Sequence, residues 1–256
     1  MKQITFADNG SIKIDAEGLF YRDLNRLLRD IVLTRKPEKV ILMNVYGQRY
    51  IGTNLNQPVK IEINGTPGND LGAFMDGPMI EVHGNAQDGC GNTMNGGEIV
   101  VHGNAGDITG ISARGGEIFV KGNVGYRVGI HMKEYQDKKP ILVIGGTAQD
   151  FLGEYMAGGV LIMLGLNLGD KDYHRANFIG TGMHGGVMYI SGKVEKRQFG
   201  KEVGQLEIDE NDRGVIKKYV RRFADYFGYN AEEILNRKFI KLLPLSLRPY
   251  GKLYAY

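Results

Sequence analysis

Met94-Asn95-Gly96-Gly97-Glu98-Ile99-Val100-Val101-His102-Gly103-Asn104-Ala105 is the segment from which the fold of this chain can be worked out. Its centre, residues 98–102, is short and rich in β-branched side chains, which favours a strand over a helix. The glycines on both sides of this centre predict sharp turns. Alternation along the strand places Ile99 and Val101 on one face and Val100 on the other. Such a short strand cannot bury its apolar face alone, so it needs neighbours of the same kind.

Those neighbours are present as repeats of the same pattern. Similar segments occupy residues 75–86, 113–124, 156–165 and 183–192. The glycines that close successive units are Gly65, Gly84, Gly103, Gly122, Gly145, Gly165 and Gly192. Three of the steps are 19 residues, and the longer ones mark insertions near residues 135–139 and 169–176. A second marker, Gly-x-x-Met, recurs in the same register, as in Gly91 to Met94.

The repeat predicts a stack of coils. In such a stack Ile80, Ile99 and Ile118 line up, and so do the valines two positions later. Each coil then covers the apolar face of its neighbour, as in a parallel β-helix. The six-residue period of left-handed helices is absent, so we expect an all-β, right-handed parallel β-helix of about seven coils over residues 59–195, flanked by short α-helical segments.

The N-terminal segment, residues 1–58, does not carry the repeat. An apolar stripe from Leu24 to Val32 predicts a helix over about residues 19–33, with Asp15 or Glu17 at its start. Pro37 would stop it. We expect strands over residues 40–45 and 59–63, the second being the first coil.

The C-terminal segment, residues 196–256, is also non-repetitive. Residues 212–238 predict two helices, the first with Val215, Tyr219 and Phe223 on one face. The apolar, proline-marked tail over residues 239–250 either folds back on the domain or docks into a partner.

Composition narrows the class of protein. Of 38 glycines, 29 lie in residues 65–192, without the strict three-residue period of collagen. The net charge of +3 gives no argument for nucleic-acid binding. The single cysteine, Cys90, cannot form an internal disulfide or a four-cysteine metal site. The N-terminus lacks the pattern of a signal peptide, so we expect a cytoplasmic location.

Two motifs suggest ligands and have simpler interpretations. Residues 180–185 match the dinucleotide pattern Gly-x-Gly-x-x-Gly, but they lead into a predicted strand instead of a helix. His83 and His102 occupy equivalent places in adjacent coils, where stacking brings residues to roughly 5 Å, so a two-histidine metal site is conceivable. Lys121 at the next equivalent place favours a solvent-facing position.

Asp88, Asp107 and Asp150 share one register, with Asn69 at the same place earlier. Such a ladder could cleave or bind a saccharide or bind calcium. Aspartate and asparagine also favour turns, which is the simpler interpretation. Cys90 has no histidine near it in the sequence, which disfavours a catalytic thiol. We therefore predict no catalytic, cofactor-binding or metal-binding residue in this chain.

The repeat resembles the C-terminal GXGXG domain of the large subunit of glutamate synthase. The resemblance covers about residues 60–195 and is carried by Gly72-Ala73-Phe74-Met75-Asp76-Gly77, residues 91–101, Gly153-Glu154-Tyr155-Met156-Ala157-Gly158-Gly159-Val160 and residues 182–190. Two N-terminal segments, residues 14–25 and 46–52, look like the stand-alone version of this domain, found where glutamate synthase is split into subunits.

The resemblance implies a right-handed β-helix without catalytic residues. In the family this domain holds a glutaminase domain and a flavin-containing synthase domain in place while ammonia passes between them. It implies a glutaminase-like chain and a flavin, iron–sulfur synthase chain as partners, and no cofactor in this chain. The β-helical subunit of formylmethanofuran dehydrogenase, which shares the repeat, is the alternative. A saccharide-binding β-helix and a lone homo-oligomeric assembly protein are further hypotheses.

Overall fold

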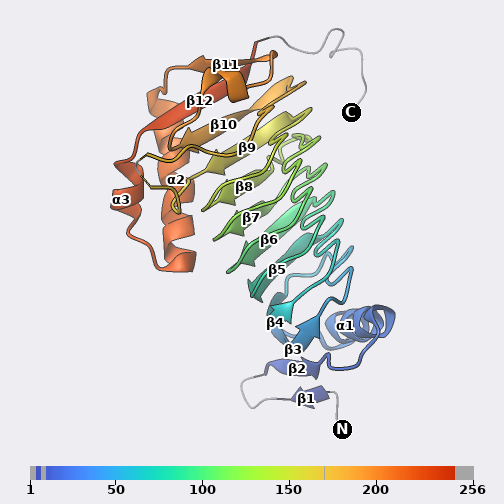
Figure 1. The fold of residues 1–256 in the computed structure, drawn as a ribbon. Coiled ribbons are helices and arrows are strands. Elements are labelled where there is room, and N and C mark those ends of the chain that lie inside the picture. Colours follow the sequence, from blue (N-terminus) through green and yellow to red (C-terminus); the bar gives the residue numbers. More distant parts are fainter. Residues whose placement is uncertain (1–3, 7–9, 170, 246–256) are drawn as a thin grey trace.

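A computed structural model describes residues 4–6, 10–169 and 171–245. Within this part of the chain, twelve strands form one sheet in the order β1 to β10, then β12 and β11 (Figure 1). The strands are β1 (Ile4–Phe6), β2 (Ile12–Asp15), β3 (Lys39–Tyr46), β4 (Lys60–Thr66), β5 (Asp76–His83), β6 (Gly96–Val101), β7 (Glu117–Val120), β8 (Ile141–Ile144), β9 (Ala157–Met163), β10 (Gly185–Ser191), β11 (Val203–Leu206) and β12 (Phe239–Pro244).

The predicted stacking of the repeats is confirmed. Strands β2 to β10 pair in parallel, each with the next. Ile80 pairs with Ile99, and Ile99 with Ile118. These isoleucines belong to one core that runs inside the coils from Ile12 to Leu242. The chain is therefore a parallel β-solenoid, of about six turns where we expected about seven.

The stack of parallel strands begins earlier in the chain than expected. Residues 59–63 do not form the first layer, because β3 already pairs in parallel with β4, and β2 with β3. Strand β1 adds an antiparallel edge to β2. The sheet therefore continues from the N-terminal segment into the repeats. The domain boundary after residue 58 stays a prediction.

Helix α1 (Tyr21–Arg35) packs beside this end of the solenoid (Figure 1). Its start was predicted wrongly, because Asp15 lies in β2 and the cap is Phe20, which makes no side-chain capping bond. The Asp15 side chain instead accepts hydrogen bonds from the Glu17 backbone and from Asn44. The helix ends just before Pro37, as expected, with Lys36 in the left-handed region.

The C-terminal segment forms the two predicted helices, α2 (Glu210–Phe227) and α3 (Ala231–Leu235), after a short 3-10 helix η1 (Lys196–Gln198). Gly228 ends α2 in the left-handed conformation. Strand β12 then pairs antiparallel with both β10 and β11. Residues 239–245 of the tail thus fold back on the domain, and residues 246–256 lie outside the described part.

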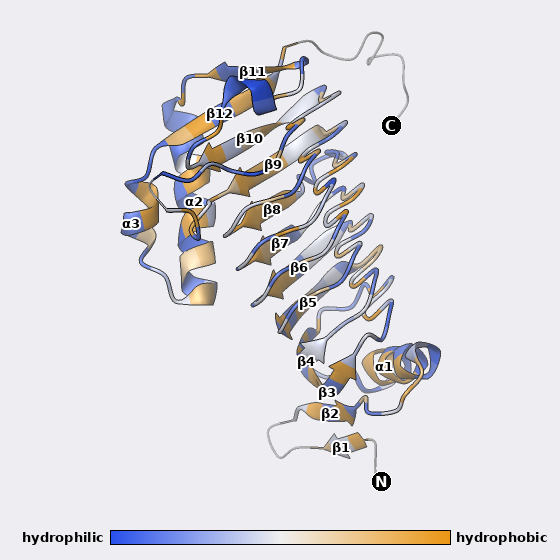
Figure 2. Ribbon diagram, in the orientation of Figure 1, coloured by the Kyte–Doolittle hydropathy of each residue, from blue (hydrophilic) through white to orange (hydrophobic). Residues whose placement is uncertain are grey.

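Helix α2 covers the outer face of the later strands (Figure 1). Outward-facing Val100, Phe119, Val143 and Ile162 pack against Val220, Phe223 and neighbouring α2 residues in a second core. Figure 2 shows hydrophobic residues both along the strands and on α2. The solenoid therefore has one core inside its coils and another between its outer face and α2.

None of the helices in the described residues combines the length and the apolar character needed to cross a membrane.

Candidate functional site

Along the solenoid recurs a corner in which residues i, i+2 and i+4 all adopt the left-handed backbone conformation. The seven corners are Tyr50/Gly52/Asn54, Asp70/Gly72/Phe74, Gly89/Gly91/Thr93, Ile108/Gly110/Ser112, Arg127/Gly129/His131, Phe151/Gly153/Tyr155 and Phe178/Gly180/Gly182. The middle residue is glycine in every corner. A Cβ atom on Gly91 would lie 2.3 Å from Cδ1 of Ile118, so a side chain there would collide with the core.

The outer two positions of each corner face away from the core and accept other residues. A residue with a side chain in this conformation costs about 1 kcal/mol or more, and hydrogen bonds to the next coil must hold it there. The backbone N–H of Phe151, for example, donates to the Asn177 carbonyl at 2.9 Å. The outer positions of the seven corners together form one edge of the solenoid, the corner edge. Its backbone is regular and is held by hydrogen bonds between coils.

The outer corner positions of the later coils carry stacked side chains. Phe151 and Phe178 stack with ring centroids 4.9 Å apart, and the Arg127 guanidinium lies 4.7 Å from the Phe151 centroid. His131 stacks on Tyr155 at 5.5 Å. This aromatic ladder was not predicted from the sequence. The available signal was the aromatic residues two positions from some of the corner glycines, such as Phe151 and Tyr155 around Gly153.

The aspartate register connects coils. Oδ1 of Asp88 accepts the backbone N–H of Asp107 at 2.9 Å, and Oδ1 of Asp107 accepts that of Tyr126 at 2.8 Å. Asp150 accepts the backbone N–H of Asn177 at 2.8 Å. These carboxylates serve as backbone acceptors at the turns, which favours the structural interpretation over saccharide cleavage.

A second ladder of this kind was missed. Oδ1 of Asn85 accepts from the Asn104 backbone, Oδ1 of Asn104 from the Asn123 backbone, and Oδ1 of Asn123 from the Thr147 backbone, at 2.8 to 2.9 Å. The signal was the Gly-Asn pair that closes three successive repeats. Because each bond joins one coil to the next, the two ladders link the middle coils of the solenoid, between residues 85 and 177.

Two other candidates lie in structural positions. Cys90 is fully buried, and burial raises the pKa of its thiol to about 12, so it is not a ready nucleophile. Residues 180–185 form a corner and enter strand β10. The backbone of a dinucleotide site would have to open a helix there, and it does not.

The histidine pair is adjacent, as the register predicted. The rings of His83 and His102 lie 5.0 Å apart on the outer face of β5 and β6. The edge of His102 also packs on Phe227 at the end of α2, with ring centroids 5.2 Å apart. No local pattern indicated that third ring, because Phe227 lies 125 positions further along the chain.

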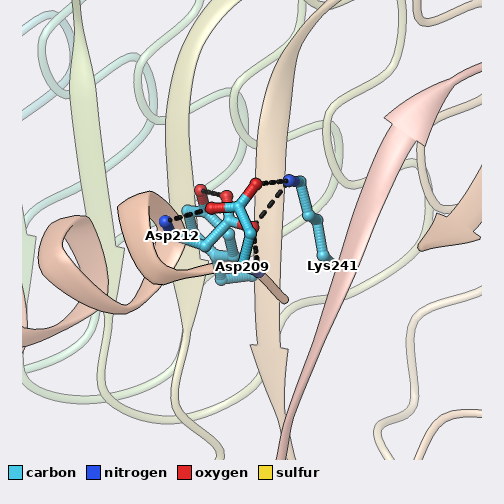
Figure 3. Close-up of polar contacts among 4 residues, drawn as sticks. Asp209, Asp212 and Lys241 are labelled. Atoms are coloured by element: carbon cyan, nitrogen blue, oxygen red, sulfur yellow. Dashed lines mark hydrogen bonds and ion pairs between the residues drawn. The ribbon is translucent and has the colours of Figure 1, made fainter. Parts of the chain in front are cut away.

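Buried Asp212 and Tyr189, with the partly buried Lys241, fasten the start of α2 to the sheet (Figure 3). The Lys241 ammonium of β12 lies 2.6 Å from a carboxylate oxygen of Asp212, and the Tyr189 hydroxyl of β10 donates to the other oxygen at 2.6 Å. Asp209 and Asp212 also form a capping box. Burial alone would raise the pKa of Asp212, but hydrogen bonds from Lys241 and Tyr189 more than offset it and lower that pKa.

The middle of α2 is fastened by one arginine. The Arg222 guanidinium pairs with Glu98 of β6 and Glu117 of β7, two residues in register with each other. Tyr226, one turn later, donates to Glu98 as well. The helix is therefore held at its start by Asp212 and at its middle by Arg222, with apolar packing between them.

Comparison with known proteins fits this geometry. The family model described as the GXGXG motif matches residues 31–245. The chain belongs to the GXGXG family. The left-handed corners, each with glycine at its centre, all lie within the matched range.

One relative and one solved structure extend the comparison. The chain is 48% identical to the uncharacterized protein MJ1350 of Methanocaldococcus jannaschii over 252 residues, which cover 95% of this chain and 96% of that protein. The fold of the present chain is similar to that of a chain in the crystal structure of the formyltransferase/hydrolase complex FhcABCD of Methylorubrum extorquens with methylofuran. There the TM-score is 0.61 and the identity 16%, with 89% of each chain covered. The second likeness shows a shared solenoid fold.

Proposed function

We propose that this GXGXG chain is a non-catalytic, cytoplasmic scaffold subunit of a glutamate synthase-like complex. It would position a glutaminase-like chain and a flavin, iron–sulfur synthase chain, which carry the cofactors and form glutamate from glutamine and 2-oxoglutarate. The activity would then belong to the assembled complex and not to this chain.

The observation that carries the proposal is that the aspartates of the repeat are engaged in hydrogen bonds between coils. The side chains that could have served chemistry, Asp88, Asp107 and Asp150, each accept a backbone N–H from the next coil. A carboxylate committed to such a bond contributes to rigidity rather than to acid–base chemistry. A long stack of coils fixed in this way offers a stable surface along which other chains can be arranged.

The N-terminal end supports the choice of complex. The two segments that resemble the stand-alone glutamate synthase domain pack against each other. The Gln48 amide donates to the carbonyls of Ala16 and Leu19, and the Asn25 amide donates to the Arg49 carbonyl. The residues that carry the resemblance thus form one cap on the first coils, as expected if they were retained together.

The structural likeness to a chain of the FhcABCD complex favours a second candidate. In this second candidate function, the present chain is the scaffold subunit of a formylmethanofuran dehydrogenase-like complex, with molybdenum- or tungsten-enzyme chains as partners. Both candidates make this chain a non-catalytic member of a multi-chain assembly, and they differ in the partners.

Affinity purification of the tagged full chain from native lysate separates the two. We expect a glutaminase-like chain and a flavin, iron–sulfur chain in the eluate, together with glutamine-dependent glutamate formation that the isolated chain lacks. Recovery of molybdenum- or tungsten-enzyme chains would replace the first candidate with the second. Purification of the chain alone, with a saccharide-dependent rise in melting temperature, would contradict both.

The exposed aromatic ladder supplies a variant for this experiment. Phe178 is about half exposed, so Phe178→Asp should leave the fold intact while placing a charge on the corner edge. If partner chains cover this edge, the variant recovers them in lower yield than the wild type. Leu33→Asp on α1, of similar exposure, is the matched control.

A further inference from the structure

We infer that Glu81, His83 and His102 form a binding site for one divalent transition-metal ion of the zinc class. One ligand atom from each of these residues lies within 4.8 Å of the other two. The site is on the outer face of the solenoid, beside the end of α2.

The register of the strands builds this arrangement. Glu81 and His83 are two positions apart on β5, so their side chains point to the same face. His102 directly follows β6, in line with His83, because Val82 pairs with Val101. Two imidazoles and one carboxylate from adjacent strands are a donor set that zinc and neighbouring metals use in proteins.

The distances suit a metal after small side-chain rotations. Oε1 of Glu81 already lies 2.9 Å from Nε2 of His102. Ligand atoms in a tetrahedral site are about 3.4 Å apart for bonds of about 2.1 Å. The side chain of His83 is exposed and can turn toward the other two. The fourth coordination position then faces solvent.

The surroundings hold two of the ligands in place. Oε2 of Glu81 accepts a hydrogen bond from the Lys60 ammonium at 2.8 Å, which leaves Oε1 for the metal. The edge of His102 packs on Phe227. Such outer partners commonly orient metal ligands.

Lys60 orients Glu81 but also brings a positive charge near the ion, and we expect the repulsion between the two cations to outweigh the loss of the orienting hydrogen bond. Replacing it with methionine removes the repulsion and frees the second carboxylate oxygen. The Lys60→Met variant should therefore bind the metal more tightly than the wild type, whereas a purely structural role of the cluster predicts no gain.

The test is a titration of the tag-free, chelator-treated full chain with Co²⁺, followed by visible absorption, and with Zn²⁺ as a competitor. We expect one equivalent of Co²⁺ to bind and Zn²⁺ to displace it. His83→Ala and Glu81→Gln should each weaken binding roughly tenfold or more. His131→Ala, an exposed histidine on the corner edge, is the control and should bind like the wild type.

His83 lies at the surface, so its alanine variant should fold normally, and circular dichroism checks this. Failure of the wild-type chain to bind Co²⁺ or Zn²⁺ saturably up to about 1 mM would overturn the inference. Equal affinities of the wild type and His83→Ala would do the same, because the bound metal would then sit elsewhere.

Discussion

The outward-facing positions of the early and the late strands differ in chemistry although they occupy one continuous register. The column runs Glu62, Glu81, Val100, Phe119, Val143, Ile162 and Tyr189, each paired with the next. The first two are charged and partly exposed, and the rest are buried. The change falls between β5 and β6, where α2 begins to cover the sheet.

The interior residues therefore determine how the coils stack, and the outward-facing residues independently determine the chemistry of the outer surface. The interior isoleucines repeat without change from β5 to β7, so the coils stack equally well on both sides of the boundary. The outer face varies with what lies on it. On β4 and β5, Lys60 pairs with Glu62 and Glu81, whereas on β6 and β7 the apolar residues meet α2.

Removing a buried α2 side chain should give the largest effect. Phe223 is fully buried between the outer face and α2, so Phe223→Ala should lower the free energy of unfolding by about 3–5 kcal/mol. Phe74→Ala, which removes a half-exposed ring on the corner edge, should change it by less than about 0.5 kcal/mol. Urea unfolding followed by circular dichroism measures both. Equal effects would mean that α2 does not cover this face.

The buried charge that fastens the start of α2 should come next. Asp212→Asn removes the nearer counter-ion of the partly buried Lys241 ammonium and leaves only Asp209 at 3.5 Å, which should cost about 2–3 kcal/mol. The double variant Asp212→Leu/Lys241→Met removes both charges and should recover a large part of this loss. If the double variant is less stable than Asp212→Asn, the pair contributes more than its desolvation costs.

The same carboxylate makes stability depend on pH. The folded pKa of Asp212 lies below its unfolded value of about 3.9, so its contribution is fully present above about pH 4. It is lost as the pH falls through the folded pKa. The difference in unfolding free energy between the wild type and Asp212→Asn should therefore shrink below about pH 4. A difference that stays constant from about pH 7 to about pH 2 would contradict this assignment.

The arginine at the middle of α2 should have a moderate effect. Arg222→Met leaves Glu98 and Glu117 side by side without their cation, and because the site is partly exposed we expect a loss of about 1–2 kcal/mol. Arg222→Lys should fall between, since an ammonium cannot span both carboxylates. Arg221→Met, at the neighbouring exposed position, is the control, with a loss below about 0.5 kcal/mol.

The uncovered face should respond least. Lys60→Met removes its ion pairs with Glu62 and Glu81, and we expect a loss below about 1 kcal/mol that decreases further in high salt. Thermal unfolding in low and high salt measures this. A salt-independent loss as large as that of Arg222→Met would mean that the early outer face is as closed as the late one.

The interior of the solenoid could be predicted because its signal is periodic. A 19-residue spacing places Ile80, Ile99 and Ile118 in one column whatever the details of the corners. The contact of His83 with His102 followed from the same register. The start of α1 could not be predicted reliably, because an aspartate before an apolar stripe can equally end a strand, as Asp15 does here, where it bonds to Asn44.

The parallel β-solenoid, its glycine-centred corners and the flanking helices can all be read from the amino-acid order, because each depends on local spacing. The face that α2 covers, the pairing of the tail at residues 239–245 and the approach of Glu81 to the two histidines emerge only from the folded molecule. Arg222 reaches Glu98 across 124 positions, and no local pattern specifies such a contact. These contacts depend on the shapes and charges that meet once the coils have stacked, so they become visible only in three dimensions.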